Sequence, residues 1–90
     1  MSAPAAPLPR LTMLGRGYCH LCDDMAADLA PLVERAGTSL AVVDIDDHPA
    51  LEARYGERVP VLFAGDIEGG RELCSGRLDR AFVEHELMRG

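Results

Sequence analysis

Two cysteines stand three positions apart in the stretch GYCHLCDDM, residues 17–25. Thiols at this spacing can form a reversible disulfide, supply two ligands of a metal site, or serve as two small apolar side chains. A third cysteine, Cys74, stands alone far downstream. An odd count of three does not fit a framework of structural disulfides, so the pair Cys19 and Cys22 is the candidate for chemistry.

The composition narrows the class of protein and its partners. The chain has 90 residues, a hydrophobic fraction of 48% and a net charge of −6, and all nine of its basic residues are arginine. These values fit one globular domain and argue against the positive surface that a nucleic acid requires. No stretch approaches the roughly 18 apolar residues of a membrane span, and the first residues do not form a signal peptide. We therefore expect a cytoplasmic monomer with no nucleic-acid or membrane partner, built as a flexible tail over 1–9 and a single domain over 10–90.

The elements that must position the cysteine pair follow from periodicity and from helix breakers. A helical stripe of apolar side chains runs from Leu21 to Ala36, and Pro31 inside it predicts a kink or a split. The run at 39–46 is almost continuously apolar and β-branched, which is typical of a strand covered on both faces. The remaining predicted elements are strands over 11–15, 59–64 and 71–75 and helices within 46–56 and 78–88.

These elements follow the order β-α-β-α-β-β-α. The two helical crossovers predict a sheet that begins parallel, and the glycine-bearing connection GDIEGG predicts an antiparallel hairpin at its edge. The predicted fold class is therefore α/β, with a four-stranded mixed sheet and helices on both of its faces. A CxxC pair at the first strand-to-helix junction of this order is the arrangement of the thioredoxin fold.

This junction favours reactivity at the first cysteine. Cys19 falls at or just before the helix N-terminus, where unpaired N–H groups and the helix dipole stabilise a thiolate. Cys22 lies one turn inside the helix, within reach of a mixed disulfide on Cys19. Arg16 and His20 favour the thiolate, whereas the two aspartates that follow the pair oppose it. We expect the helix N-terminus to dominate.

The stretch RVPVLF, residues 58–63, supplies a second feature of the site. A proline at the start of a central strand is out of place, because it removes a donor from the hydrogen-bond ladder. A cis bond between Val59 and Pro60 resolves this conflict at a cost of only about 0.5–1 kcal/mol. It also exposes the N–H and C=O of Val59 for pairing with an extended substrate. The alternative is an ordinary proline at a strand edge.

With these features in place, the chain resembles the glutaredoxin-like branch of the thioredoxin superfamily, and within it small bacterial glutaredoxin-like proteins of unknown function. The resemblance spans about residues 10–88 and rests on GYCHLCDDM, VVDIDDHPALEARYGERVPVLF and LCSGRLD. It implies that Cys19 attacks, that Cys22 resolves, and that Val59–Pro60 is the cis-proline site.

The resemblance also implies a glutathione site, with departures from the usual pattern. Arg16 stands where glutaredoxins carry a lysine that contacts glutathione, and an arginine can hold a carboxylate bidentately. Asp79 matches the region that holds the glutathione amino group, Gly76 remains of a double glycine, and His20 stands where proline is usual. Tyr18 is expected to cover the disulfide or to contact substrate. Glutathione is a candidate reductant, and protein or glutathione disulfides are the candidate substrates.

The leading prediction is a thiol–disulfide oxidoreductase without a tightly bound cofactor or metal. One alternative is a metal or iron–sulfur module, for which Cys74 with a histidine, or glutathione between two chains, would have to supply further ligands. Another is a redox-inert interaction module on the same fold. We interpret Asp44, Asp46 and Asp47 as capping and solvated residues, and Cys74 as a small buried side chain, with a redox role near the cis-proline as its alternative.

Overall fold

The computed structural model describes residues 10–88, so the tail predicted over 1–9 lies outside the described residues, as do the last two residues of the domain predicted over 10–90. The elements occur in the predicted order β-α-β-α-β-β-α. They are β1 (Leu11–Gly15), α1 (His20–Ala36), β2 (Leu40–Asp44), the 3₁₀ turn η1 (Ile45–Asp47), α2 (Pro49–Tyr55), β3 (Val61–Ala64), β4 (Arg71–Ser75) and α3 (Arg80–Met88).

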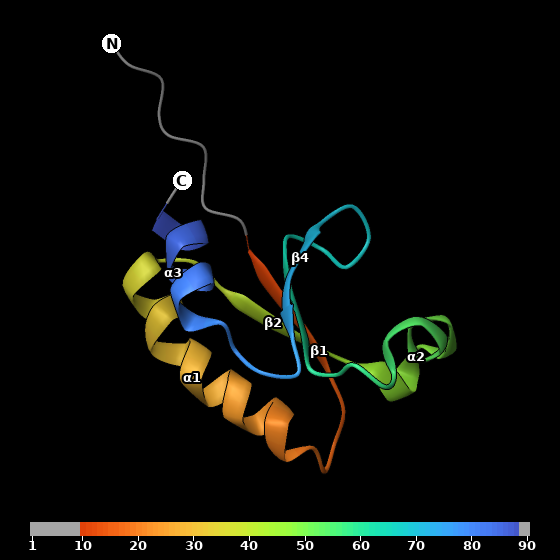
Figure 1. Ribbon diagram of the computed structural model, residues 1–90. Helices are drawn as coiled ribbons and strands as arrows, with labels where there is room; N and C mark the ends of the chain where they lie inside the picture. The colour runs from red at the N-terminus through yellow and green to blue at the C-terminus, as the bar shows by residue number, and fades with distance from the viewer. Residues whose placement is uncertain (1–9, 89–90) are drawn as a thin grey trace.

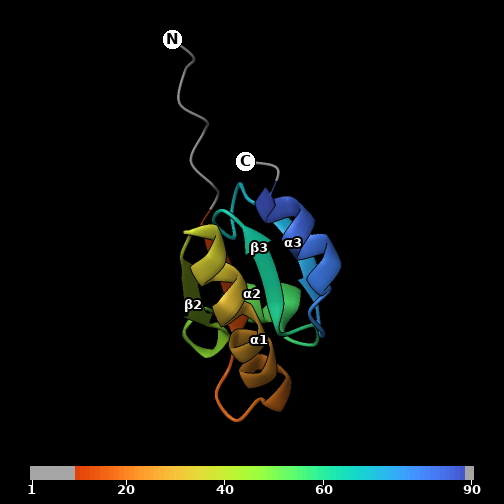
Figure 2. The same cartoon turned by 90° about the vertical axis from the view of Figure 1, so that its left-hand side faces the viewer.

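The four strands form one mixed sheet in the order β2-β1-β3-β4. β1 and β2 are parallel, whereas β3 is antiparallel to both β1 and β4. Figure 1 shows α1 and α3 on one face of this sheet and α2 on the other. Figure 2, seen from the side of α1 and α3, places these two helices in front of the strands. The α/β class and the four-stranded mixed sheet are as predicted, and the GDIEGG connection forms the expected antiparallel hairpin.

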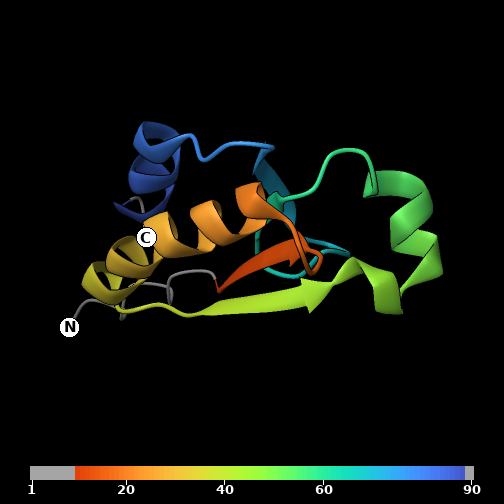
Figure 3. The same cartoon turned by 90° about the horizontal axis from the view of Figure 1, so that it is seen from below.

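The sheet begins with a parallel pair, β1 and β2, as predicted. The second predicted crossover, through α2, does not produce another parallel strand, because β3 is antiparallel to β1. α2 has seven residues, a length of about 10 Å at the rise of an α-helix. A five-residue strand is longer, at about 17 Å, so α2 is too short to carry the chain back along it. Instead α2 lies beyond the ends of β1 and β2, as Figure 3 shows. The chain therefore re-enters the sheet from the end at which it left.

The segment 39–46 was expected to be a strand covered on both faces, and this is wrong. β2 covers Leu40–Asp44 and lies at the edge of the sheet, with Ala41 exposed and Val42 61% exposed. All five residues of β1 are buried instead, because β1 is paired on both sides and covered on both faces. The apolar residues at 39–46 instead pack on opposite faces of the sheet: Leu40 contacts one core cluster and Val43 contacts the other.

Two apolar clusters lie on the two faces of the sheet. The alternation of side chains along β3 divides them: Leu62 belongs to the cluster under α1 and α3, whereas Val61 and Phe63 belong to the cluster under α2. The ring of Tyr55 meets that of Phe63 edge to face at 5.6 Å between centroids. The larger cluster packs α1 onto the sheet through four buried side chains of that helix, Cys22, Met25, Leu29 and Leu32.

α1 is one continuous helix, so the split predicted at Pro31 does not occur. Pro31 and Ala27 are both exposed. Water can therefore reach the Ala27 carbonyl, which loses its usual N–H donor four residues on. The helix ends at Gly37, whose φ of 71° is the left-handed conformation that favours glycine. No helix in the described range 10–88 is both long and apolar enough to cross a bilayer.

Two aspartates cap the first turn of a helix, and for Asp44 this confirms the predicted capping role. The side-chain oxygen of Asp79 accepts a hydrogen bond from the N–H of Phe82 at 3.2 Å at the start of α3. The side chain of Asp44 accepts one from the N–H of Asp46 at 2.9 Å and so begins η1. Each carboxylate thus accepts a backbone N–H that has no partner within its own helix.

Candidate functional site

Cys19 is the N-cap residue of α1. Its backbone is extended, with φ −115° and ψ 106°, and its Sγ accepts a hydrogen bond from the N–H of Cys22 at 3.1 Å. An oxygen of Ser, Thr, Asp or Asn usually accepts this bond at an N-cap. The sulfur of Cys19 therefore lies at the positive end of the helix dipole, where a negative charge is stabilised.

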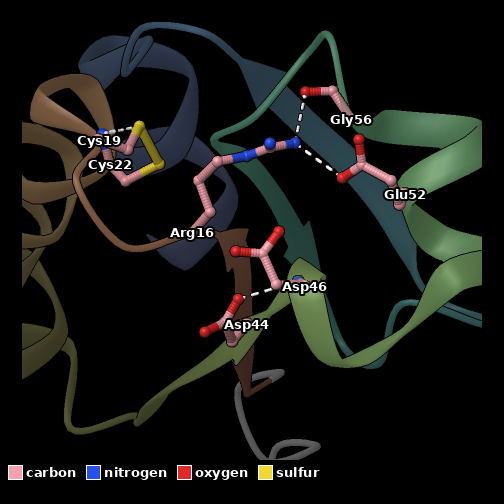
Figure 4. A network of polar contacts seen from close by, with 7 residues as sticks. All are labelled: Arg16, Cys19, Cys22, Asp44, Asp46, Glu52 and Gly56. Carbon is pink, nitrogen blue, oxygen red and sulfur yellow. Dashed lines mark hydrogen bonds and ion pairs between the residues drawn. A yellow bond between two sulfur atoms is a disulfide. The ribbon is translucent and has the colours of Figure 1, made fainter.

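Cys19 and Cys22 form a disulfide (Figure 4), with their Cα atoms 5.2 Å apart. Cys22 is 3% exposed, whereas Cys19 is partly exposed. A dissolved thiol or disulfide therefore reaches Cys19 first. Gly15, at the end of β1, makes room for this arrangement, because a Cβ there would lie only 3.2 Å from the Sγ of Cys22.

The loop before the pair contains a residue in a rarely populated backbone conformation. Tyr18 has a φ of 58°, the left-handed region that a bulky side chain seldom adopts, and its side chain is fully exposed. A fully exposed ring is not packed over the disulfide, so of its two predicted roles only contact with substrate stays a prediction. His20, the first residue of α1, is also exposed.

The peptide bond between Val59 and Pro60 is cis. Pro60 is buried, and its carbonyl accepts a hydrogen bond from the N–H of Gly76 at 2.8 Å. Val59 and Cys19 pack against the same apolar cluster under α1 and α3. The loop that leads to α3 contacts the start of β3 through the hydrogen bond from Gly76 to Pro60, and Gly76 also lines a cavity with Leu21 and Asp24 from the start of α1.

Arg16 does not lie free beside the disulfide. Its Nη2 donates to Oε2 of Glu52 at 2.8 Å, within α2, and to the carbonyl oxygen of Gly56 at 3.0 Å, just after that helix (Figure 4). Arg16 therefore binds a carboxylate of the protein itself, that of Glu52, and does so through one nitrogen and not bidentately. The role of Arg16 toward glutathione stays a prediction. Sequence reasoning missed Glu52, because 36 positions separate it from Arg16 and no local pattern joins them.

Cys74 is a free thiol on β4 and is partly buried. Burial raises the pKa of the Cys74 thiol, and the negative charges of Asp79 and Glu72 act in the same direction. The backbone hydrogen bond at Asp79 lowers that pKa but does not reverse the shift. Cys74 is therefore a weak nucleophile at neutral pH. Within residues 10–88, no group of three His, Cys, Asp or Glu side chains is placed to hold a metal ion.

The fold has counterparts among known proteins. Residues 10–88 match the family described as Glutaredoxin-like domain (DUF836). The chain belongs to this family. The chain is also similar to an uncharacterized protein of Mycobacterium tuberculosis (strain ATCC 25618 / H37Rv), 32% identical over 86 residues, a match that covers 90% of this chain and 84% of the relative.

Solved structures agree with the fold. Protein Ne2328 of Nitrosomonas europaea is similar with a TM-score of 0.78 and 36% identity, over 94% of this chain and 96% of that one. Protein XcR50 of X. campestris is 41% identical with a TM-score of 0.66, over 89% of this chain and 97% of that one. Thioredoxin 1 of Thermosipho africanus shares the fold with a TM-score of 0.63 at 17% identity, over 89% and 91%.

Proposed function

We propose that this member of the glutaredoxin-like domain family is a thiol–disulfide oxidoreductase, with Cys19 as the attacking thiol and Cys22 as the resolving thiol. One observation carries the proposal. The partly exposed sulfur of Cys19 caps α1 and accepts the N–H of Cys22, while Cys22 lies buried beside it. A thiolate is the reactive form of cysteine, and this position stabilises a thiolate at the accessible sulfur.

The reaction consists of two thiol–disulfide exchanges. In the first, the Cys19 thiolate attacks one sulfur of a substrate disulfide, the substrate S–S bond breaks, and one substrate thiolate leaves and takes up a proton. In the second, Cys22 loses its proton and attacks the sulfur of Cys19 in the mixed disulfide. The second substrate thiol leaves, and the Cys19–Cys22 disulfide forms. The substrate gains two electrons and the protein loses two.

The rim of the disulfide supplies the groups that would hold a substrate. We propose that an extended substrate pairs with the backbone of Val59 beside the cis-proline, as in β-strand addition. Exposed Tyr18 and His20 precede and follow Cys19, and the N–H of Gly76 donates to the carbonyl of Pro60. Asp79 follows Gly76 by three residues and caps the start of α3. Contacts from these four residues belong to the proposal.

The proposed substrates are protein disulfides or glutathione disulfide, and glutathione is the proposed reductant that regenerates the dithiol. We further propose that the protein acts as a monomer in the cytoplasm, without a tightly bound cofactor and without a nucleic-acid or membrane partner. A reducing compartment suits a disulfide that is transient and catalytic.

Equilibration in glutathione redox buffers tests the proposal. The protein, freed of metal by a chelator, is held at a series of ratios of reduced to oxidised glutathione. Free thiols are then trapped in acid and located by mass spectrometry. We expect one two-electron transition that joins Cys19 to Cys22, while Cys74 stays free throughout.

Two outcomes would contradict this proposal in different ways. Persistent glutathionylation of Cys19 without the internal disulfide would remove the resolving role of Cys22. If neither cysteine responded within the range of the glutathione buffers, the oxidoreductase function would be wrong, and metal content would separate the iron–sulfur alternative from the redox-inert one. The variant Cys74→Ser is the matched control, since its transition should coincide with that of the unmodified protein.

A further inference from the structure

The guanidinium of Arg16 connects two segments that border the proposed substrate site. Arg16 precedes Cys19 by three residues, and its Nη2 is bound to Glu52 and to the carbonyl of Gly56. Gly56 in turn stands four residues before Pro60. Figure 4 shows the Arg16 side chain reaching from the loop beside the disulfide to the end of α2. Arg16 thus joins the cysteine loop to the segment that leads to the cis-proline.

Gly56 leaves room for the carboxylate of Glu52. A Cβ at this position would collide with Glu52 Oε1, so a larger residue would displace the carboxylate that meets Arg16. The side chains of Arg16 and Glu52 are 32% and 47% exposed, so the pair stands at the border of solvent. A substrate can therefore reach this pair, but the positive charge that it meets is already neutralised.

The other charges beside the disulfide are negative. Arg16, Cys22, Asp23 and Asp44 line one cavity of about 250 Å³ between α1 and the edge of the sheet. With Arg16 paired to Glu52, the carboxylates of Asp23 and Asp44 are the remaining charges in the lining of this cavity, which adjoins the disulfide at Cys22. An anionic substrate therefore meets repulsion here unless it takes Arg16 away from Glu52.

We propose that Glu52 is a specificity-determining residue that selects against anionic disulfides, with glutathione disulfide as the test case. The inference rests on the proposed function of Cys19. The Glu52 carboxylate binds Nη2 of Arg16 and offsets the charge of the guanidinium, so it competes electrostatically with a substrate carboxylate. Neutral or cationic disulfides need no such exchange, so they react with Cys19 without displacing Glu52.

Competing disulfides of different charge test this selectivity. The reduced protein and its Glu52→Gln variant are mixed with glutathione disulfide, which is anionic, and with cystamine, which is cationic. The rates of oxidation are followed by acid quenching and mass spectrometry. We expect Glu52→Gln to raise the ratio of the glutathione rate to the cystamine rate by about two- to fivefold, the range that a partly exposed charge pair supports.

A matched variant separates the specific pair from the overall charge. Glu57→Gln removes one negative charge from an exposed residue near the same end of α2, and we expect it to leave the ratio nearly unchanged. High salt should reduce the effect of Glu52→Gln, because exposed charges are screened. An unchanged ratio in Glu52→Gln, or an equal rise in Glu57→Gln, would overturn this inference alone. Failure of Cys19 to react with either disulfide would overturn the proposed function as well.

Discussion

The variant Cys22→Ser isolates the thiol that the proposal makes reactive. Serine keeps the backbone N–H that donates to the Cys19 sulfur at 3.1 Å, so the local geometry of the cap is retained. The variant then carries two free thiols in opposite surroundings. Cys19 lies at a helix N-terminus, whereas Cys74 has its pKa raised by burial and by neighbouring carboxylates.

The size of the effect follows from the capping contact. A hydrogen bond to a charged acceptor contributes about 1.5–3 kcal/mol, and a helix N-terminus adds about 0.3–1 kcal/mol. Partial exposure of Cys19 and the nearby charges of Asp23 and Asp24 reduce this sum, so about 1.5 kcal/mol remains, or roughly tenfold in thiolate population. Nucleophilicity falls as basicity falls, with a Brønsted coefficient of about 0.4–0.5, which leaves a gain of about threefold over an ordinary thiol. The reaction rate of Cys19 should exceed that of Cys74 by more than about tenfold, because the pKa of Cys74 is raised.

Alkylation by iodoacetamide measures both thiols in one experiment. Aliquots of reduced Cys22→Ser are quenched over time between about pH 5 and pH 9, and each cysteine is quantified by mass spectrometry. The same variant in guanidinium chloride supplies the rate of an ordinary thiol. We expect the Cys19 profile to rise at lower pH than in the unfolded chain. Equal rates at Cys19 and Cys74 near pH 7, or a Cys19 profile that matches the unfolded chain, would refute the reasoning.

Three further predictions concern stability. Asp79→Ala removes the cap of α3 and should lower the free energy of unfolding by about 0.5–2 kcal/mol in urea titration, with exposed Glu68→Ala as a surface control. Gly15→Ala places a Cβ 3.2 Å from the Sγ of Cys22. This substitution should lower the free energy of unfolding by about 1–3 kcal/mol. An equal loss when Gly15→Ala is made in a Cys22→Ala background would contradict a clash with the Cys22 sulfur. Folding raises the pKa of Cys74, so the protonated thiol adds stability below the unfolded value of about 8.5. That contribution is lost as pH rises through the folded value, and urea titrations at neutral and alkaline pH should show a decline that Cys74→Ala lacks.

The features that could be predicted from the sequence are those set by local chemistry. Cys19 at the start of a helix and the cap at Asp79 each depend on residues within one turn. The strand β1 follows from one short apolar run with a glycine stop. Such features survive in the fold because tertiary packing does not compete with them.

The features that could not be predicted depend on which segments become neighbours. Apolar side chains at 39–46 indicated a strand covered on both faces, but β2 is at the edge because the chain adds β3 to the other side of β1. The pair between Arg16 and Glu52 likewise exists only because the end of α2 returns to the end of β1. Neither periodicity nor spacing within a segment carries that information.

The direction of β3, which the crossover rule missed, is what assembles the candidate site. Val61 pairs with Leu14 at the end of β1 that leads into the cysteine loop. Had β3 run parallel to β1, its first residue would instead lie near Leu11, about 10–13 Å away along the strand. Pro60 would then be at the far end of the sheet from Cys19. The short α2, by keeping the chain at one end of the sheet, places the cis-proline, the cysteine pair and the Arg16–Glu52 contact at the same end of the fold.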